Sequence, residues 1–167
     1  MRFSETNIEP IKIEHVKKII EWQYKEPYDI YNLEDDEEIL DSFMSRHCYV
    51  LTHNYGEIIG YYYYGQEATI TFSSTKAYED NSYIDIGLGL NPKYVSCGIG
   101  PWFLNHGIDY FSNLLNYNKF RLTVLENNVR ALKLYTKVGF KISYIFPSNI
   151  TKANFIVMVY NLANKLS

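Results

Sequence analysis

The segment from Tyr83 to Phe140 constrains the fold of this chain most, because strand and helix patterns alternate in it without interruption. Tyr83–Leu90 places apolar side chains at every second position, as in a half-buried strand. A glycine-bearing loop, Val95–Gly100, leads directly into a helix that we expect over Pro101–Asn116, and Lys119–Leu125 has the pattern of the next strand. Two strands joined by a helix are expected to lie parallel in one sheet.

The rest of the chain continues this alternation, so we predict a single α/β domain over residues 1–167. No linker, repeat or low-complexity segment interrupts the pattern, and 167 residues with 47% apolar content suffice for a full core. The further helices are expected over Glu14–Tyr24, Glu34–Arg46 and Asn128–Val138. The further strands are expected over Asn7–Ile13, His47–Thr52, Glu57–Gly65, Ala68–Ser73, Lys141–Phe146 and Phe155–Leu162, with a loop over Ser74–Ser82.

The formal charge of −3 conceals an uneven distribution along the chain. Residues 1–80 carry 7 basic and 16 acidic side chains, whereas residues 81–167 carry 9 basic and 3 acidic ones. We therefore expect an anion to meet the second half and a cation the first. The overall balance argues against a general nucleic-acid binder. No apolar run approaches the ~18 residues of a membrane span, and the N-terminus lacks a signal-peptide pattern.

Cysteine and histidine spacing predicts neither a disulfide framework nor a metal site. Cys48 and Cys97 have no metal-ligand spacing, and their small number favours a reduced, cytoplasmic location. The histidines likewise show no metal-ligand spacing, at positions His15, His47, His53 and His106.

The acidic run Glu34–Glu38 could hold a cation. We favour a solvated first helical turn, where the helix dipole stabilises negative charge, because apolar periodicity begins just after it.

The loop Val95–Gly100 has the features of an anion site. Gly98 and Gly100 let the backbone approach a ligand closely, and the helix that follows directs its N–H groups and dipole toward the same place. Phosphate is the usual occupant of such a site. Lys93 precedes the loop, and a later helix brings Arg130, Lys133 and Lys137. A tight turn without a ligand is the alternative interpretation. Neither a Walker loop nor a complete dinucleotide fingerprint is present.

The stretch Leu122–Phe140 is the most informative part of the chain. Its apolar side chains share one helical face, at Ala131, Leu134, Tyr135 and Val138. Asn128 can cap the start of the helix, and Gly139 with Phe140 fits a left-handed cap at its end. On these grounds alone, Tyr135 would be interpreted as a core tyrosine.

At this point the sequence resembles the GNAT superfamily of N-acetyltransferases, through two motifs in the family's order. Val95–Gly100 matches the acetyl-coenzyme-A loop of the form Q/R-x-x-G-x-G/A. The family's next helix has the form N-x-x-A-x-x-L-Y-x-x-x-G-F, which this chain matches at every fixed position. Those positions are Asn128, Ala131, Leu134, Tyr135, Gly139 and Phe140. The resemblance implies a mixed α/β fold with a centrally splayed β-sheet flanked by helices.

The resemblance also implies an activity, acetyl transfer from acetyl-CoA to a primary amine that attacks the thioester directly. The amides of Cys97, Gly98, Ile99 and Gly100 would bind the coenzyme pyrophosphate, beside Val95 and Lys133. Main-chain groups around Leu88–Leu90 would pair with the pantetheine arm, as would the side chain of Asn128. Tyr135 would act as general acid toward the departing thiolate, a role that its free pKa near ~10 permits. Acetyl-CoA is the expected cosubstrate, and no metal is implied.

Two departures from the family pattern bear on coenzyme binding. Val95 stands where the family has Gln or Arg, so a polar group near the phosphates is missing. Pro101 removes one N–H just after the second glycine. An acyl-CoA-binding module without catalysis, using the same fold to sense its ligand, is therefore the alternative to an enzyme.

The proton acceptor and the amine site are less well defined by sequence. Asp85 is the first candidate for a general base because it is the one acid on its strand, and Glu126 is the second. Each could instead be an exposed carboxylate or a helix-cap partner. The acceptor, a small cationic amine or a peptide amine, would lie among the first two helices, which are rich in aromatic side chains: Trp22, Tyr24, Tyr28 and Tyr31. These aromatics could simply pack the helices together. Many relatives form dimers, so a homodimer is compatible with the resemblance.

Overall fold

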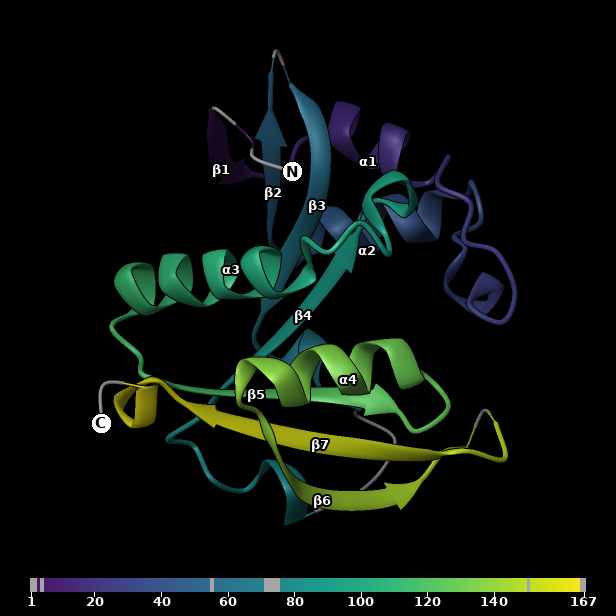
Figure 1. The fold of residues 1–167 in the computed structure, drawn as a ribbon. Coiled ribbons are helices and arrows are strands. Elements are labelled where there is room, and N and C mark those ends of the chain that lie inside the picture. Colours follow the sequence, from purple (N-terminus) through teal and green to yellow (C-terminus); the bar gives the residue numbers. More distant parts are fainter. Residues whose placement is uncertain (1–2, 4, 55, 71–75, 150, 166–167) are drawn as a thin grey trace. The chain divides into compact units, whose positions relative to one another are not determined.

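The computed structural model describes residues 3, 5–54, 56–70, 76–149 and 151–165 (Figure 1). Within them, the strands are β1 (Thr6–Pro10), β2 (His47–His53), β3 (Glu57–Tyr64), β4 (Ile84–Leu90), β5 (Lys119–Leu125), β6 (Lys141–Pro147) and β7 (Asn154–Asn161). The helices are α1 (Ile13–Ile19), α2 (Glu37–Ser45), α3 (Gly100–Leu115) and α4 (Val129–Val138). The strands are hydrogen-bonded in the order β1-β2-β3-β4-β5-β7-β6, mostly antiparallel. The predicted mixed α/β fold is confirmed.

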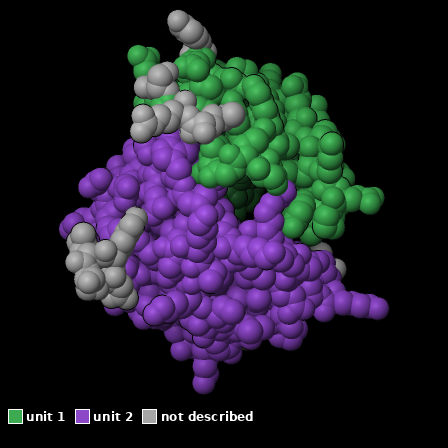
Figure 2. Space-filling model, in the orientation of Figure 1, with its two compact units in different colours: residues 1–64, 88–99 green, residues 65–87, 100–167 purple. Residues whose placement is uncertain are grey.

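The chain divides into two compact units, which Figure 2 shows in different colours. Unit 1 contains residues 1–64 and 88–99, and unit 2 contains residues 65–87 and 100–167. Strand β4 contributes its first four residues to unit 2 and its last three to unit 1. The expectation of a single domain remains a prediction.

Unit 1 is an antiparallel β1–β2–β3 arrangement with two helices packed on it. Its core combines apolar side chains from both helices, from strands β2 and β3 and from the connection between β1 and α1: Ile11, Val16, Ile19, Phe43, Cys48, Val50 and Ile58. Helix α2 begins where Asp36 accepts a hydrogen bond from the amide of Ile39 at 2.7 Å. The acidic run therefore supplies a helix cap, as the favoured interpretation predicted.

Unit 2 combines α3 and α4 with strands β5, β7 and β6, which pair antiparallel. Its parallel ladder between β4 and β5 consists of only two register pairs, Ile84–Phe120 and Asp85–Arg121. Such a short ladder is expected where the two central strands diverge. The second loop glycine, Gly100, opens α3 against α4, because a Cβ there would lie 3.1 Å from Leu134.

The structure departs most from the sequence prediction in three places. The first strand ends at Pro10, and Ile13, its expected last residue, begins helix α1. Helix α1 ends at Ile19 rather than Tyr24, and the main chain of Tyr24 bonds the side chain of Asn32, which accepts from its amide and donates to its carbonyl. Residues 66–68 form a 3-10 turn and residues 69–70 form no strand, so the start of the expected strand Ala68–Ser73 is wrong. Residues 71–73 lie outside the described part. No described helix is long and apolar enough to cross a membrane.

Candidate functional site

The loop that precedes α3 has an open, left-handed backbone. Ser96 has φ 62° and Gly98 has φ 78°, a region that side-chain-bearing residues seldom adopt. Both residues are exposed, and a Cβ placed on Gly98 would meet nothing within 4 Å. Buried Ile99 holds the end of the loop on the protein. The main chain of residues 96–98 is thus accessible to a ligand.

The amides of this loop differ in their hydrogen bonding. The amide of Cys97 donates to the carbonyl of Tyr94 at 3.3 Å, so it closes a turn of the chain itself. Within the described residues, the amides of Gly98, Ile99 and Gly100 donate no hydrogen bond. Such N–H groups at the start of a helix favour an anion. Of the four amides predicted to bind pyrophosphate, these three are therefore available to a ligand, and their role stays a prediction.

The end of β4 is held by an aromatic side chain from the segment after α1. The hydroxyl of Tyr24 donates to the carbonyl of Leu90 at 2.8 Å. Leu88 and Leu90, whose main chain is predicted to pair with pantetheine, are both half-buried. The Leu90 carbonyl therefore already has a protein donor.

A second tyrosine covers β4 at Gly89. A Cβ on Gly89 would overlap the ring of Tyr61 and lie 2.6 Å from its hydroxyl oxygen, so only glycine fits beneath this ring. Trp22 stacks on Tyr61 with ring centroids 6.0 Å apart, and Phe43 meets it edge-on at 5.2 Å. Burial raises the pKa of Tyr61 well above its usual range, so the phenol keeps its proton. Of the predicted acceptor aromatics, Trp22 thus belongs to a cluster that contacts β4.

The other two predicted acceptor aromatics lie around a 3-10 turn, Asp29–Tyr31. Tyr28 is half-buried and Tyr31 is exposed. Tyr61 belongs to the run Tyr61–Tyr64, whose alternation along a strand predicts ordinary sheet packing, and Tyr24 was expected only among the aromatic side chains of the acceptor region. Two glycines on one face of a strand, Gly87 and Gly89, are the signal that could have indicated a close neighbour over β4.

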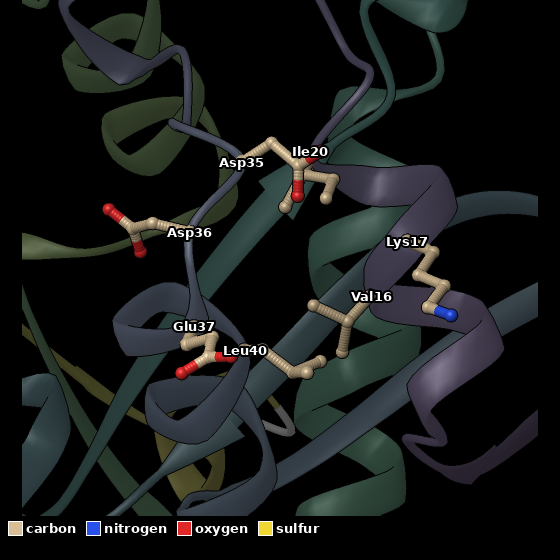
Figure 3. Close-up of a pocket in the computed structure, with 7 residues that line it drawn as sticks. All are labelled: Val16, Lys17, Ile20, Asp35, Asp36, Glu37 and Leu40. Atoms are coloured by element: carbon tan, nitrogen blue, oxygen red, sulfur yellow. The ribbon is translucent and has the colours of Figure 1, made fainter.

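A hollow of about 220 Å³ lies in unit 1 between α1 and the start of α2. Figure 3 shows Val16 and Leu40 facing each other across it, whereas the capping residue Asp36 points away. The remaining lining residues are Lys17, Ile20, Asp35 and Glu37. Its lining thus combines apolar side chains with carboxylates and the ammonium group of Lys17.

Helix α4 carries the second motif of the sequence in unit 2. The side-chain oxygen of Asn128 accepts from the amide of Ala131 at 3.1 Å, which confirms the N-cap. Tyr135 is 9% exposed, with its ring centroid 6.0 Å from that of Phe140. Gly139 ends the helix in the left-handed conformation, as predicted. Lys133 is exposed, on the side of the helix away from its buried stripe.

Asp85 lies in a buried ion pair. Its two carboxylate oxygens each accept a hydrogen bond from Arg121, both at 2.7 Å. The remaining Arg121 nitrogen, Nη1, donates to the carbonyls of Ala77 and Asp80. Burial opposes the charge of the guanidinium, but the hydrogen bonds and charge of Asp85 outweigh it and raise the pKa of Arg121. Asp85 is neither the exposed carboxylate nor the cap partner that sequence analysis considered, and Arg121 was not singled out.

The second candidate base, Glu126, follows the end of β5. Its carboxylate accepts from the side-chain amide of Asn154 at 2.9 Å, and its main-chain amide donates to the Asn154 carbonyl, also at 2.9 Å. The residue is exposed. Unlike Asp85, it has no arginine bound to both oxygens among the residues that the structure describes.

The sequence was compared with models of protein families and with curated proteins. The sequence model of the acetyltransferase (GNAT) family matches residues 13–140, which include both motifs. No curated protein matches the chain.

Solved structures share the fold at low sequence identity. A spermidine N-acetyltransferase chimera of Vibrio cholerae SpeG and hSSAT has a TM-score of 0.74 at 16% identity, covering 98% of this chain and 99% of that one. The aminoglycoside acetyltransferase AAC(6')-Ib in complex with coenzyme A has a TM-score of 0.70 at 15% identity, covering 98% and 100%. A GNAT-family acetyltransferase from Bacillus anthracis has a TM-score of 0.69 at 12% identity, covering 97% and 98%.

Proposed function

The chain belongs to the acetyltransferase (GNAT) family, and we propose that it transfers the acetyl group of acetyl-CoA directly to a primary amine. The observation that carries this proposal is the loop before α3. Its exposed, left-handed backbone suits the coenzyme pyrophosphate, as do the amides of Gly98, Ile99 and Gly100, which donate to no other described residue. A Cβ-free Gly98 with open space around it lets the phosphates approach the main chain.

The proposed reaction needs no nucleophile from the protein. Acetyl-CoA supplies an activated thioester. The neutral amine nitrogen attacks its carbonyl carbon, an N–C bond forms and the C–S bond breaks. The departing sulfur takes a proton from the hydroxyl of Tyr135. The proton lost by the amine goes to a base or to water, from which the Tyr135 phenolate regains a proton. The product is an amide together with free CoA thiol.

The proposed residues belong to both units, and each unit is considered by itself. Unit 1 contains the loop as far as Ile99 and the β4 main chain around Leu88–Leu90. Unit 2 contains Gly100, Tyr135, Lys133 as a proposed cation for the phosphates and Asn128 as a proposed contact to pantetheine. That contact would be a second role for Asn128, whose side chain already caps α4.

We propose a small cationic amine as the acceptor, received by Trp22 and the neighbouring Tyr28 and Tyr31. Aromatic faces attract cations. The carboxylates around the hollow in unit 1, such as Asp35 and Glu37, add a field that favours positive charge. Two of the structural neighbours are named for spermidine and aminoglycosides, both cationic amines.

The general base is a separate part of the proposal. Asp85 remains a candidate, but Arg121 donates to both of its oxygens, so a substrate proton would have to compete with the guanidinium for them. Glu126 is exposed and, among the described residues, lacks such an arginine. Water can also take the proton, because the amine nitrogen becomes acidic as its bond to the carbonyl carbon forms.

A homodimer is also part of the proposal. Strand β6 stands at one end of the strand order and exposes large apolar side chains, among them Ile142 at 57% and Ile145 at 52%. An exposed apolar edge strand favours association with another chain. Light scattering on the purified protein would give its mass in solution.

A thiol-release assay tests the proposed activity. Acetyl-CoA is mixed with the protein and with polyamines, aminoglycosides or peptides in turn, and release of CoA thiol is followed. We expect amine-dependent release with at least one cationic amine and none without protein. If CoA raises the melting temperature of the protein but no amine is acetylated, the result would instead favour the acyl-CoA-sensing module. That alternative was raised because Val95 replaces the polar residue of the family pattern. Absence of both would contradict the proposal.

A further inference from the structure

A cluster of titratable side chains lies in unit 1 where the β2–β3 hairpin meets the segment before the phosphate-binding loop. His53, at the end of β2, is 9% exposed. Its Nε2 lies 2.8 Å from the hydroxyl oxygen of Tyr94 and 3.4 Å from a carboxylate oxygen of Glu57, the first residue of β3. The ammonium group of Lys93 donates to the other Glu57 oxygen. Three segments of the chain therefore converge on one carboxylate.

The protonation states of this cluster follow from its contacts. Burial, together with hydrogen bonding to Glu57, raises the pKa of Tyr94 to about 12, so its hydroxyl keeps a proton near neutral pH. Hydrogen bonds from Lys93 and Tyr94 lower the pKa of Glu57, so this carboxylate is ionised. The phenol can donate to the carboxylate and accept from His53.

Tyr94 connects this cluster to the loop. It is the last residue of a 3-10 turn, Pro92–Tyr94, and its carbonyl accepts from the amide of Cys97. The start of the same turn is held by Asn91, whose amide donates to the carbonyl of Ile59 and whose side chain donates to that of Ile58, both at 2.9 Å. The segment leading into the loop is thus tied to β3 by its main chain at one end and by the Tyr94 side chain at the other.

We infer that His53, Glu57 and Tyr94 are positioning residues, which hold the loop in the conformation that binds the coenzyme phosphates. This inference rests on the proposed function, since it assigns a purpose to the geometry of that loop. The hydroxyl of Tyr94 is the central atom, because it joins the histidine and the carboxylate to the residue immediately before Val95.

One feature distinguishes this cluster from an ordinary structural ion pair. The Nδ1 atom of His53 is buried and has no hydrogen-bond partner among the described residues. Leaving a buried polar atom unsatisfied is costly, and native proteins seldom do so without a reason. The cost is consistent with a histidine that is held for its Nε2 contact with Tyr94.

The test separates the phosphate-bearing end of the coenzyme from the rest. Tyr94→Phe removes one hydroxyl and keeps the ring. Dissociation constants are measured by isothermal titration calorimetry for CoA and for pantetheine, which lacks the phosphates. We expect the Kd of CoA to rise about three- to tenfold, because the variant loses a hydrogen bond that orders the loop. The Kd of pantetheine should stay unchanged, because pantetheine has no phosphates for the loop to bind. His53→Phe should raise the CoA Kd in the same way. The double variant should raise it by less than the product of the two single effects.

Tyr78→Phe is the matched control, because it removes a tyrosine hydroxyl of unit 2 that is bonded to Thr123 at 2.7 Å and to the amide of Ile70. It should leave both dissociation constants unchanged. An unchanged CoA Kd in Tyr94→Phe, or an equal rise for CoA and pantetheine, would overturn the inference. If Tyr94→Phe is too unstable to measure, Glu57→Gln tests the same contact, with the same outcomes. A wild-type chain that does not bind CoA would overturn the proposed function itself, and this inference with it.

Discussion

The two units hold the residues that we predict to be functional by different physical means. In unit 1, the predicted groups are main-chain atoms of an exposed loop and of the end of β4, held in place by side chains such as Tyr24, Tyr61 and Tyr94. In unit 2, the predicted residues Tyr135 and Asp85 are buried side chains, and Asp85 pairs with Arg121. Substitutions of these two buried residues should therefore change folding or the chemical step, whereas those at the loop of unit 1 should change ligand affinity.

The largest effect is expected for Asp85→Asn in unit 2. The substitution leaves the guanidinium of Arg121 buried without its counter-charge, and breaking a buried pair in this way costs about 3–5 kcal/mol of unfolding free energy. Urea unfolding measures this loss. Asp80→Asn is the control, because the Asp80 side chain is exposed and its amide replacement can still accept from Ser82. Its effect should stay within about 0.5 kcal/mol.

The same variant tests the role of Asp85 in chemistry. If Asp85 is a structural residue, the activity that remains keeps the wild-type pH–rate profile. A general base would instead lose the limb of that profile that reports its ionisation. A stable Asp85→Asn protein with an altered profile would contradict the structural interpretation and restore Asp85 as the base.

Tyr135→Phe should have the second-largest effect, on turnover rather than on folding. Loss of a general acid lowers kcat by roughly 100-fold or more, while KM for acetyl-CoA changes little because the ring is retained. Steady-state kinetics with the best amine substrate measures both constants. Tyr144→Phe, at an exposed tyrosine of β6, should leave kcat unchanged. Wild-type kcat in Tyr135→Phe would make Tyr135 the core tyrosine of the alternative interpretation.

Gly89→Ala should have an intermediate effect that is confined to unit 1. The new methyl group overlaps the Tyr61 ring, which Trp22 and Phe43 keep from moving aside. Overpacking of this kind costs about 1–3 kcal/mol of unfolding free energy. Combining it with Tyr61→Leu, which shortens the overlapping side chain, should recover part of that loss. A Gly89→Ala protein of wild-type stability would show that the tyrosine is not confined.

The sequence predicted best those structural features that depend on residues close together along the chain. The periodicity and caps of α4 lie within residues 128–140, and the predicted β5, Lys119–Leu125, coincides with the observed strand. The loop glycines, Gly98 and Gly100, were likewise identified from local pattern. In each case the physical cause is a side chain or a backbone conformation within a few residues.

Contacts between distant residues account for what was missed. Arg121 and Tyr94 reach partners 36 and 41 positions away, Asp85 and His53, and no periodicity reports such pairs. Tyr24 shows the same on a smaller scale: it was expected to be helical, and its main chain bonds the side chain of Asn32, eight residues later. Nothing in the local sequence of these residues distinguished them, because their structural roles depend on partners that only folding brings close.

The smallest of these effects is expected for Gly98→Ala, which tests whether the loop of unit 1 acts through its backbone conformation. The residue has φ 78°, where a Cβ costs about 1 kcal/mol, and there is no neighbour for that Cβ to strike. The strain favours other loop conformations, so the Kd of CoA should rise about fivefold by calorimetry. Gly98→Asn tolerates the left-handed region better and should recover most of this affinity. If both variants bind CoA as weakly as each other, the added side chain blocks the ligand. If both bind it as tightly as the wild type, the left-handed backbone at this position contributes nothing to coenzyme binding.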